Sequence, residues 1–300
     1  SMEVRFGESM KAHTTFRIGG LADAYCVPSS SKEFCELITF ADNEGLPWFV
    51  LGGGANLLVS DRGMRGLVIS TSGFSAHSII EEADKNKRIC KVQAGLPVAK
   101  LADLLANAGW SGLEFAASLP GSVGGAVFMN ARCYGREIAD TLCRVSYFDT
   151  RRGIFGSLDL VREDWAYKHT PFMPGAALET SIILEAEFLF VKKDTREMRA
   201  EMDGYTKDRV CKGHFDFPSA GSMFKNNHDF GRPTGAILDE LGFRGRRVGD
   251  AMVSPKHANI FVNAGNASAD DMHKLVEEAQ ESAYKAFGYK LEPEVVFTGD

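Results

Sequence analysis

The chain has 300 residues, 44% of them hydrophobic and 25% charged, which is typical of a globular protein with two or three domains. This composition excludes a disordered chain, a collagen-like fibre and a coiled coil. Lys and Arg number 34 against 40 Asp and Glu, a net charge of −6, so the basic excess of a general nucleic-acid binder is missing and we expect no nucleic-acid partner.

Apolar runs in the sequence are short. The most apolar stretch, 182–191, contains two glutamates and falls well short of the roughly 18 residues that cross a bilayer. The N-terminus has no apolar signal core, so we expect no membrane insertion and a cytoplasmic protein. The six cysteines form no Cys-x-x-Cys pair and the histidines no His-x-x-x-His pair, which predicts free thiols and no metal site.

Periodicity predicts an alternation of strands and helices. The first strand is expected at 22–27, followed by a helix from the capping-box residues Ser30-Ser31-Lys32-Glu33 to about Asn43. Further strands are expected at 47–51, 66–70, within 77–94, and at 181–191, 220–225, 258–262 and 291–297. Further helices are expected at 97–108, 194–209, 233–241 and 269–287. The mixed order favours an α+β fold over a doubly wound sheet.

Two glycine-rich segments are candidates for cradling phosphate. Gly52-Gly53-Gly54-Ala55-Asn56-Leu57 directly follows a predicted strand, and its glycines allow the backbone to approach an anion. The segment matches neither Gly-x-Gly-x-x-Gly nor a P-loop, so a tight turn between strands is an equal alternative. Pro120-Gly121-Ser122 is followed by Gly124 and Gly125, and it has the same two interpretations. Two such segments in one chain indicate a long ligand with a diphosphate.

The two segments and several other motifs resemble one enzyme family. Gly52 to Asp61 resembles the first flavin-binding signature of the UDP-N-acetylenolpyruvylglucosamine reductases, the MurB family. Other stretches resemble, in order, the opening motif, the second signature, the catalytic serine motif, the C-terminal domain and the closing motif of this family: 14–20, 112–131, 218–226, 248–259 and 291–295. The resemblance covers almost the whole chain.

The resemblance implies a cofactor, a fold and a reaction. It implies non-covalent FAD in a two-part binding region of the vanillyl-alcohol-oxidase/PCMH type, with a smaller α+β substrate domain. The corresponding domains would be 1–72, 73–212 and 213–300. In this family NADPH reduces the flavin, which then reduces UDP-N-acetylglucosamine enolpyruvate, a nucleotide-sugar, to the peptidoglycan precursor UDP-N-acetylmuramate. The cofactor contacts would be Gly52, Gly53, Gly54, Ala55, Asn56, Leu57, Pro120, Gly121, Ser122, Gly124 and Gly125.

Three catalytic residues follow from the resemblance. Hydride arrival at the alkene creates an enolate-like carbanion, which needs fixed donors and one proton. Ser222 matches the serine that delivers this proton. The alternative is that Ser222 only forms a turn after Gly221 and has no catalytic role. Glu294 matches the assisting glutamate, and like charge on the substrate carboxylate would keep it protonated as a donor. We prefer it to Glu292, two residues earlier.

The third catalytic position departs from the family. Lys168 stands where the family has arginine, so the charge is kept but the planar bidentate fork is lost. The nearby Arg162 could take the place of the family's arginine instead. Lys168 would then be an ordinary exposed lysine without a catalytic role. Lys168 and Ser222 lie 54 positions apart, a spacing that resembles the subtype lacking an inserted substrate-covering loop. The candidate substrate contacts are Tyr167, Arg209, Lys225 and Asn226.

Two other functions stay open at the level of the sequence. One is a different FAD-dependent oxidoreductase on the same fold with another electron acceptor. This function stays open because Lys168 stands in place of the family's arginine. The other is a nucleotide-sugar binding module without catalysis, which the presence of Ser222 and Glu294 disfavours. The oligomeric state is not indicated by the sequence.

Overall fold

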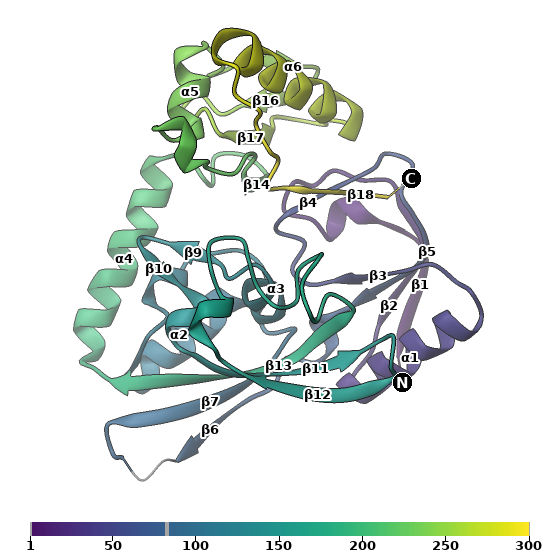
Figure 1. The fold of residues 1–300 in the computed structure, drawn as a ribbon, viewed down its shortest axis with the longest axis vertical. Helices are drawn as coiled ribbons and strands as arrows, with labels where there is room; N and C mark the ends of the chain where they lie inside the picture. The colour runs from purple at the N-terminus through teal and green to yellow at the C-terminus, as the bar shows by residue number, and fades with distance from the viewer. Residues whose placement is uncertain (1, 82–83, 300) are drawn as a thin grey trace. The chain divides into compact units, whose positions relative to one another are not determined.

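The computed structural model describes residues 2–81 and 84–299 and consists of helices and sheets in mixed order (Figure 1). The chain forms two compact units. Unit 1 comprises Ser1–Val4, Cys26–Gly53 and Leu67–Lys207, and unit 2 comprises Arg5–Tyr25, Gly54–Gly66 and Asp208–Asp300. Each unit is therefore assembled from segments that lie far apart in the sequence.

A largely antiparallel sheet is the main feature of unit 1. Its strands run in the order β12-β11-β13-β7-β6, and the short β8 also pairs with β13. The bounds are β6 His77–Glu81, β7 Lys87–Gln93, β8 Trp110–Ser111, β11 Leu142–Asp149, β12 Ile154–Asp159 and β13 Ser181–Lys192. The predicted pair within 77–94 and the strand at 181–191 are confirmed, whereas β11 and β12 were not predicted.

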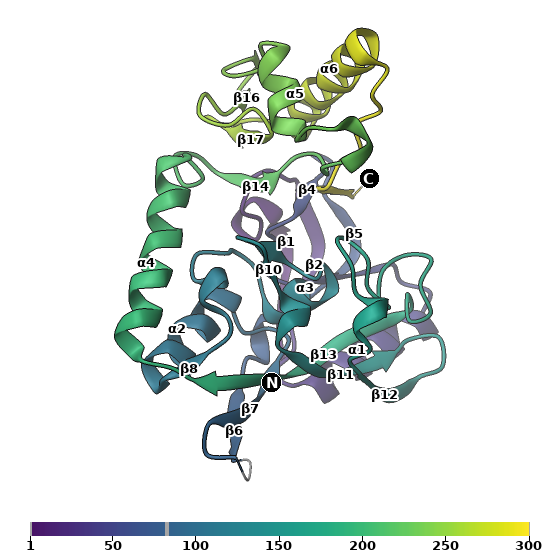
Figure 2. The same ribbon diagram turned by 60° about the vertical axis from the view of Figure 1, so that its left-hand side comes forward.

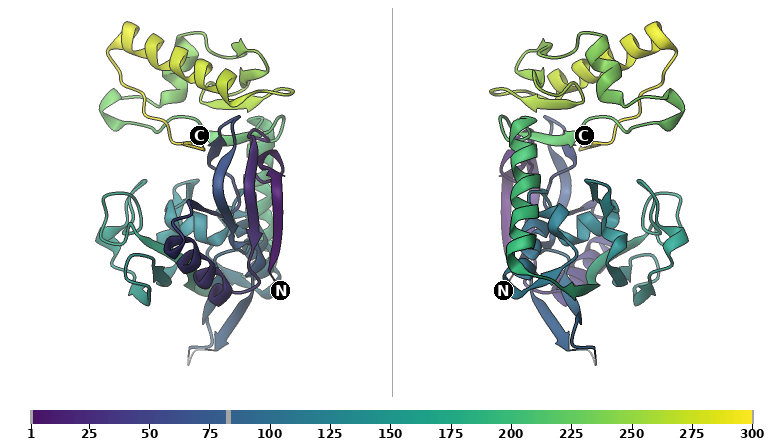
Figure 3. Two further views of the ribbon diagram at one scale, coloured as in Figure 1. Left: turned by 90° about the vertical axis from the view of Figure 1, so that its right-hand side faces the viewer. Right: turned by 90° about the vertical axis from the view of Figure 1, so that its left-hand side faces the viewer.

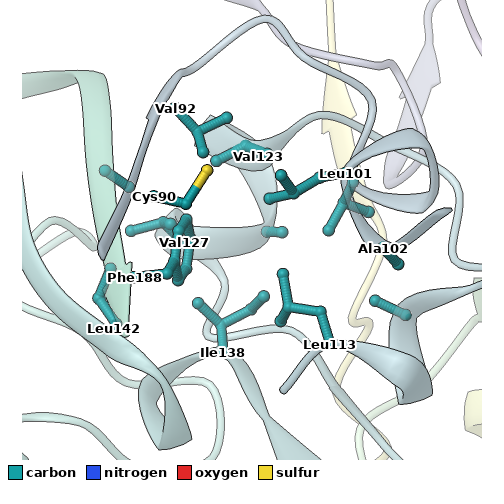
Figure 4. Close-up of a cluster of buried hydrophobic side chains, with 14 of the residues drawn as sticks. Cys90, Val92, Leu101, Ala102, Leu113, Val123, Val127, Ile138, Leu142 and Phe188 are labelled. Atoms are coloured by element: carbon teal, nitrogen blue, oxygen red, sulfur yellow. The ribbon is translucent and has the colours of Figure 1, made fainter. Parts of the chain in front are cut away.

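Helices α2 (Val98–Ala108) and α3 (Val123–Phe128) belong to the core of this unit. Their apolar side chains pack against Cys90 and Val92 of β7 and Phe188 of β13 (Figure 4). The spacing that predicted α2 is that of one helix face, and Leu101 and Leu105 on this face are buried. A left-handed Gly109 ends the helix.

A second sheet runs in the order β1-β2-β5-β3, with β3 and β5 parallel. Its strands are β1 Glu3–Ser9, β2 Leu21–Val27, β3 Trp48–Leu51 and β5 Met64–Ser70. The helix before β3, α1 (Ser31–Asn43), begins as predicted, because the Ser30 hydroxyl accepts a hydrogen bond from the Glu33 N–H. The Glu33 carboxylate bonds Ser29 and not Ser30, so only half of the predicted capping box forms.

The C-terminal third of the chain forms a small α+β structure in unit 2. Its sheet has the order β14-β17-β16-β15, and α6 packs along it beside α5 (Figures 2 and 3). The bounds are β14 Ser219–Ser222, α5 Thr234–Glu240, β15 Arg247–Val248, β16 Ala251–Val253, β17 Ile260–Asn263 and α6 Ala269–Phe287. Helix α6 has the predicted bounds, and its buried Met272, Leu275, Val276 and Ala279 form one apolar face.

The predicted closing strand 291–297 is wrong over most of its length. Only β18 (Val296–Thr298) is a strand, and it pairs in parallel with β4 (Leu57–Val59). Residues 291–295 form an irregular segment with one isolated bridge, between Pro293 and Phe224. Proline lacks the N–H that a strand interior needs, which explains the interruption.

The remaining regular elements connect these parts. A short pair, β9 (Arg132–Cys133) and β10 (Arg136–Glu137), follows α3. Helix α4 (Thr195–Cys211) confirms the predicted helix at 194–209, and the boundary between the units falls within it. The chain also passes from one unit to the other between Gly53 and Gly54, inside the first glycine-rich segment. The domain bounds predicted from the sequence stay a prediction.

Candidate functional site

The two glycine-rich segments meet in unit 1. A Cβ added to Gly53 would lie 2.5 Å from the Gly121 Cα, and one added to Gly52 would lie 2.7 Å from the Ser122 Oγ. Only glycine allows backbones to approach this closely. Segments that lie almost 70 positions apart in the sequence therefore form one feature, which we call the glycine junction (Gly52, Gly53, Gly121 and Ser122).

Backbone donors at the glycine junction are available to a ligand. Among the described residues, none accepts a hydrogen bond from the N–H groups of these four junction residues. Unpartnered amide N–H groups on adjacent loops bind anions, and glycine lets a bulky anion approach them. This arrangement fits a diphosphate such as that of FAD, and contact of the two segments with the cofactor stays a prediction.

The second segment continues into a short helix. The Ser122 hydroxyl caps α3 by accepting a hydrogen bond from the Gly125 N–H at 3.3 Å. Gly124 is required by packing, since a Cβ there would lie 2.8 Å from the Ala94 Cβ. Pro120 precedes the left-handed Gly121, whose φ is +105°. Gly124 thus holds the helix against its sheet, while Gly121 and Ser122 belong to the junction.

The rest of the first segment lies in unit 2. Gly54 has a φ of +62°, and a Cβ there would lie 2.0 Å from the His13 carbonyl oxygen. The Gly54 carbonyl accepts a hydrogen bond from the Thr15 N–H, so the predicted opening motif packs directly on this glycine. Ala55 and Asn56 form a turn that leads into β4 at Leu57.

We expect Gly53→Ala to weaken FAD binding about tenfold to a hundredfold, because forcing apart packed backbone costs about 1–3 kcal/mol. The added methyl would collide with the Gly121 Cα and open the glycine junction. Fluorescence titration of the apoprotein with FAD measures the change. Gly204→Ala in α4 is the matched control, because a Cβ there meets nothing within 4 Å. Equal affinity of the two variants would show that the junction does not hold the cofactor.

Ser222 lies at the end of β14, directly after a β-bulge. Ser219 pairs with Val262 and Ser222 with Ile260. The paired positions are therefore three residues apart on β14 but only two apart on β17, so β14 contains one extra residue. Gly221 takes up the extra residue with a φ of +76°, which favours glycine. Bulges re-aim side chains beside active sites, and this one sets the direction of the half-buried Ser222.

Asn259 holds the chain after Ser222, a role that was not predicted. Its buried side chain accepts from the Phe224 N–H at 3.0 Å and donates to the Phe224 carbonyl at 2.8 Å. This side chain replaces a strand neighbour, so the predicted strand 220–225 ends at Ser222. The signal was present in the Lys256-His257-Ala258-Asn259 motif, which gave family membership but no role for the asparagine.

Glu294 lies beside this part of the chain. Its N–H donates to the Met223 carbonyl at 2.7 Å, so Glu294 and Ser222 belong to neighbouring backbone segments of unit 2. Its own carbonyl accepts from the Asn56 side-chain amide at 3.0 Å. The structure therefore brings together Ser222, Glu294 and Asn56, which the sequence assigned to different motifs.

Lys168 and Tyr167 lie in unit 1, in a tight turn. The backbones of Ala166 and His169 exchange hydrogen bonds, and Lys168 has a φ of +54°. This turn is fixed to the segment that follows α3, because the Asn130 side chain donates to the Ala166 carbonyl. The Lys168 ammonium lies 5.8 Å from the centre of the Tyr167 ring.

Arg162, the nearby alternative to Lys168, already has partners. Its guanidinium bonds the buried Glu137 carboxylate, donates to the Trp165 carbonyl at 2.7 Å, and lies 3.9 Å from Asp140. Withdrawing it would leave a carboxylate buried without its partner, which is costly. The structure therefore disfavours Arg162 as the substitute.

The other candidate substrate contacts lie in unit 2. The Lys225 ammonium is 3.3 Å from the exposed Glu292 carboxylate, and the Asn226 side chain accepts from the Thr234 N–H at the start of α5. The Arg209 guanidinium lies 5.6 Å from the Phe215 ring centre, and its Nε is buried without a hydrogen-bond partner among the described residues. Substrate contact by these residues stays a prediction.

Burial lowers the pKa of nearby His214 to about 4, with the charge of Arg209 as a further cause. The unfolded chain binds this proton near the ordinary pKa of 6.5, so folding stability should fall as the pH drops from 6.5 toward 4. We expect His214→Gln to lessen this loss, measured as Tm against pH. His257, whose pKa burial also lowers, supplies the remainder. His228→Gln on an exposed residue is the control, and equal pH profiles of the two variants would contradict the assignment.

Searches for other kinds of site gave negative results within residues 2–81 and 84–299. No group of three or more His, Cys, Asp or Glu is arranged to hold a metal ion. No helix there is long and apolar enough to cross a membrane. The six cysteines are free thiols, as predicted.

Comparison with known proteins extends these observations. Residues 22–154 match the family model of an FAD binding domain, and residues 213–298 match that of the UDP-N-acetylenolpyruvoylglucosamine reductase C-terminal domain. The UDP-N-acetylenolpyruvoylglucosamine reductases of Agathobacter rectalis and Treponema denticola are 41% and 38% identical. The alignments cover 98% and 99% of this chain and 93% and 94% of the relatives.

A solved structure agrees with the sequence relatives. The UDP-N-acetylenolpyruvylglucosamine reductase (MurB) of Thermus caldophilus superimposes with a TM-score of 0.78 and is 31% identical in sequence. The alignment covers 99% of this chain and 98% of the Thermus caldophilus chain. The predicted α+β fold with an FAD-binding region of the vanillyl-alcohol-oxidase/PCMH type is confirmed, as is FAD as cofactor. The chain belongs to the UDP-N-acetylenolpyruvoylglucosamine reductase family of FAD-dependent oxidoreductases.

Proposed function

We propose that this chain reduces UDP-N-acetylglucosamine enolpyruvate to UDP-N-acetylmuramate with NADPH, and that Ser222, Glu294 and Lys168 carry the chemistry. The observation that carries the proposal is the neighbourhood of Ser222 and Glu294, whose backbones are joined through the Glu294 N–H and the Met223 carbonyl. Family membership supplies the reaction, an FAD-dependent step of peptidoglycan precursor synthesis.

The glycine junction suits the diphosphate of the cofactor, and Gly54, Ala55 and Leu57 continue the same segment. Bound at this junction, FAD would supply hydride transfer from NADPH to the enolpyruvyl alkene of the substrate. The protein then has to stabilise the negative charge that appears next to the substrate carboxylate, and to supply one proton.

Ser222 supplies the proton in this proposal. A serine hydroxyl is a weak acid, but the carbanion formed by hydride addition is basic enough to take its proton. The O–H bond of Ser222 breaks as the new C–H bond forms, and solvent returns a proton to the serine oxygen. The bulge at Gly221 matters because proton transfer requires the hydroxyl to be aimed within hydrogen-bond distance of the carbon.

Glu294 and Lys168 stabilise the enolate in this proposal. A protonated Glu294 donates a hydrogen bond to the enolate oxygen, and the Lys168 ammonium offsets the charge of the carboxylate. A lysine lacks the two parallel donors of arginine, so orientation depends more on the backbone of its turn. The hydrogen bond from Asn130 to Ala166 fixes that turn.

The test is an anaerobic visible spectrum of the FAD-loaded protein through two additions. NADPH should bleach the flavin band, and UDP-N-acetylglucosamine enolpyruvate should restore it. Bleaching without recovery would overturn the assigned substrate, or show that the Lys168 site is impaired, and would favour another acceptor on the same fold. Lys168→Arg separates these two outcomes, because arginine would restore recovery only if the substrate is correct.

A further inference from the structure

The segment that carries Glu294 is anchored by the buried side chains of Leu291 and Val295 and by individual hydrogen bonds instead of a strand ladder. Residues 291–295 form no regular strand, and the Lys225 N–H donates to the Glu292 carbonyl at 2.9 Å on the upstream side. At Glu294, the N–H donates to the Met223 carbonyl and the carbonyl accepts from the Asn56 Nδ2 at 3.0 Å. The Asn56 side chain thus holds the downstream side of the Glu294 peptide.

Asn56 is itself firmly anchored. Its carbonyl accepts a hydrogen bond from the Val296 N–H at 2.9 Å, and the next residue, Leu57, begins the parallel pairing of β4 with β18 at Val296. Asn56 and Glu294 are 238 positions apart in the chain. The backbone and side chain of one asparagine therefore bind both sides of the Glu294–Val296 step.

We infer that Asn56 is the positioning residue of Glu294, and that its side chain acts there and not as a contact to the cofactor. The inference deepens the proposed function and rests on it for the role of Glu294. The glycine-rich segment then has a double use: its backbone serves the cofactor, and its last polar side chain fixes the acid that meets the substrate. A displacement of about 1 Å at such a group can cost about a hundredfold in rate.

Asn56→Asp and Asn56→Leu test the inference, because both keep the approximate volume and remove the amide donor. We expect FAD affinity and the rate of flavin reduction by NADPH to stay within about twofold of the parent protein. The rate of flavin reoxidation by UDP-N-acetylglucosamine enolpyruvate should fall about tenfold to a hundredfold. Weakened FAD binding or slowed reduction by NADPH in both variants would overturn the inference, since it would make Asn56 a residue of the cofactor site.

A double-mutant cycle shows whether Asn56 acts through Glu294. In a Glu294→Ala background, the further loss from Asn56→Asp should be less than twofold, because no carboxyl group remains to be positioned. A loss as large as in the parent protein would overturn the inference. Asn263→Asp is the matched control: it removes the side-chain amide hydrogen bonds to the Phe16 and Arg17 carbonyls in the same unit and should leave the relative rates of the two half-reactions unchanged.

Failure of the proposed function has a different signature. If the unmutated protein does not recover its flavin band with this substrate, the reaction itself is wrongly assigned. If it recovers but Glu294→Ala recovers equally fast, the role of Glu294 is wrong and the inference on Asn56 falls with it. Both results differ from the outcome that would overturn only the inference on Asn56. In that outcome, Asn56→Asp slows flavin reoxidation as strongly in the Glu294→Ala background as in the parent protein.

Discussion

Ser222→Ala should reduce NADPH-dependent turnover by about 10²–10⁴-fold, the usual contribution of a positioned proton donor. The loss should fall entirely on the second half-reaction, since removing the hydroxyl leaves no proton source at the carbanion while flavin reduction by NADPH needs none from it. The β-bulge at Gly221 is unaffected, because the backbone of residue 222 stays paired with Ile260. Stopped-flow absorbance of the flavin, with NADPH and substrate added in sequence, separates the two steps.

The matched control for this variant is Ser219→Ala, on the same strand and paired with Val262. It also removes a serine hydroxyl group, three residues earlier in the chain. The rates of both half-reactions should stay within about twofold of those of the parent protein. Normal recovery of the flavin band in Ser222→Ala would show that another group delivers the proton. Loss of both half-reactions would indicate damage to the fold or to the cofactor site.

Glu294→Ala should slow the second half-reaction about 10²–10³-fold, which is the usual effect of removing one donor to a developing oxyanion. Glu294→Gln should lose less, because an amide N–H can also donate to the enolate oxygen. The order Glu, then Gln, then Ala is therefore the expected order of rates. An ionised carboxylate acting only by charge would instead make Gln as poor as Ala.

Glu292→Ala is the control for the glutamate series. Glu292 is exposed, lies two residues away and pairs with Lys225 at 3.3 Å. Its removal should leave flavin reoxidation at saturating substrate unchanged, because an exposed ion pair contributes little to structure. A loss in Glu292→Ala equal to that in Glu294→Ala would mean that the two glutamates had been assigned in the wrong order.

Periodicity and local chemistry were sufficient for every helix except the short α3 and for strands such as β7 and β13, but not for β11, β12 or the closing strand. Helix α6 and the Ser30 cap of α1 could be predicted because a long amphipathic pattern and a capping serine are properties of adjacent residues. The motif residues of the site, Ser222 and Glu294 among them, came from the family resemblance. The close approach of the glycine junction agrees with the reason for expecting glycine there, which is that a backbone needs room beside an anion.

Contacts between distant parts of the chain decided the rest. The bulge before Ser222 depends on the pairing of β14 with β17, and the end of β14 depends on the Asn259 side chain. Neither feature can be recognised in residues 218–226 alone. The hydrogen bond from Asn56 to Glu294 joins residues 238 positions apart. A pattern of neighbouring residues reports local conformation, whereas a side-chain amide can satisfy any backbone group that folding brings near it, and only the tertiary structure shows which one.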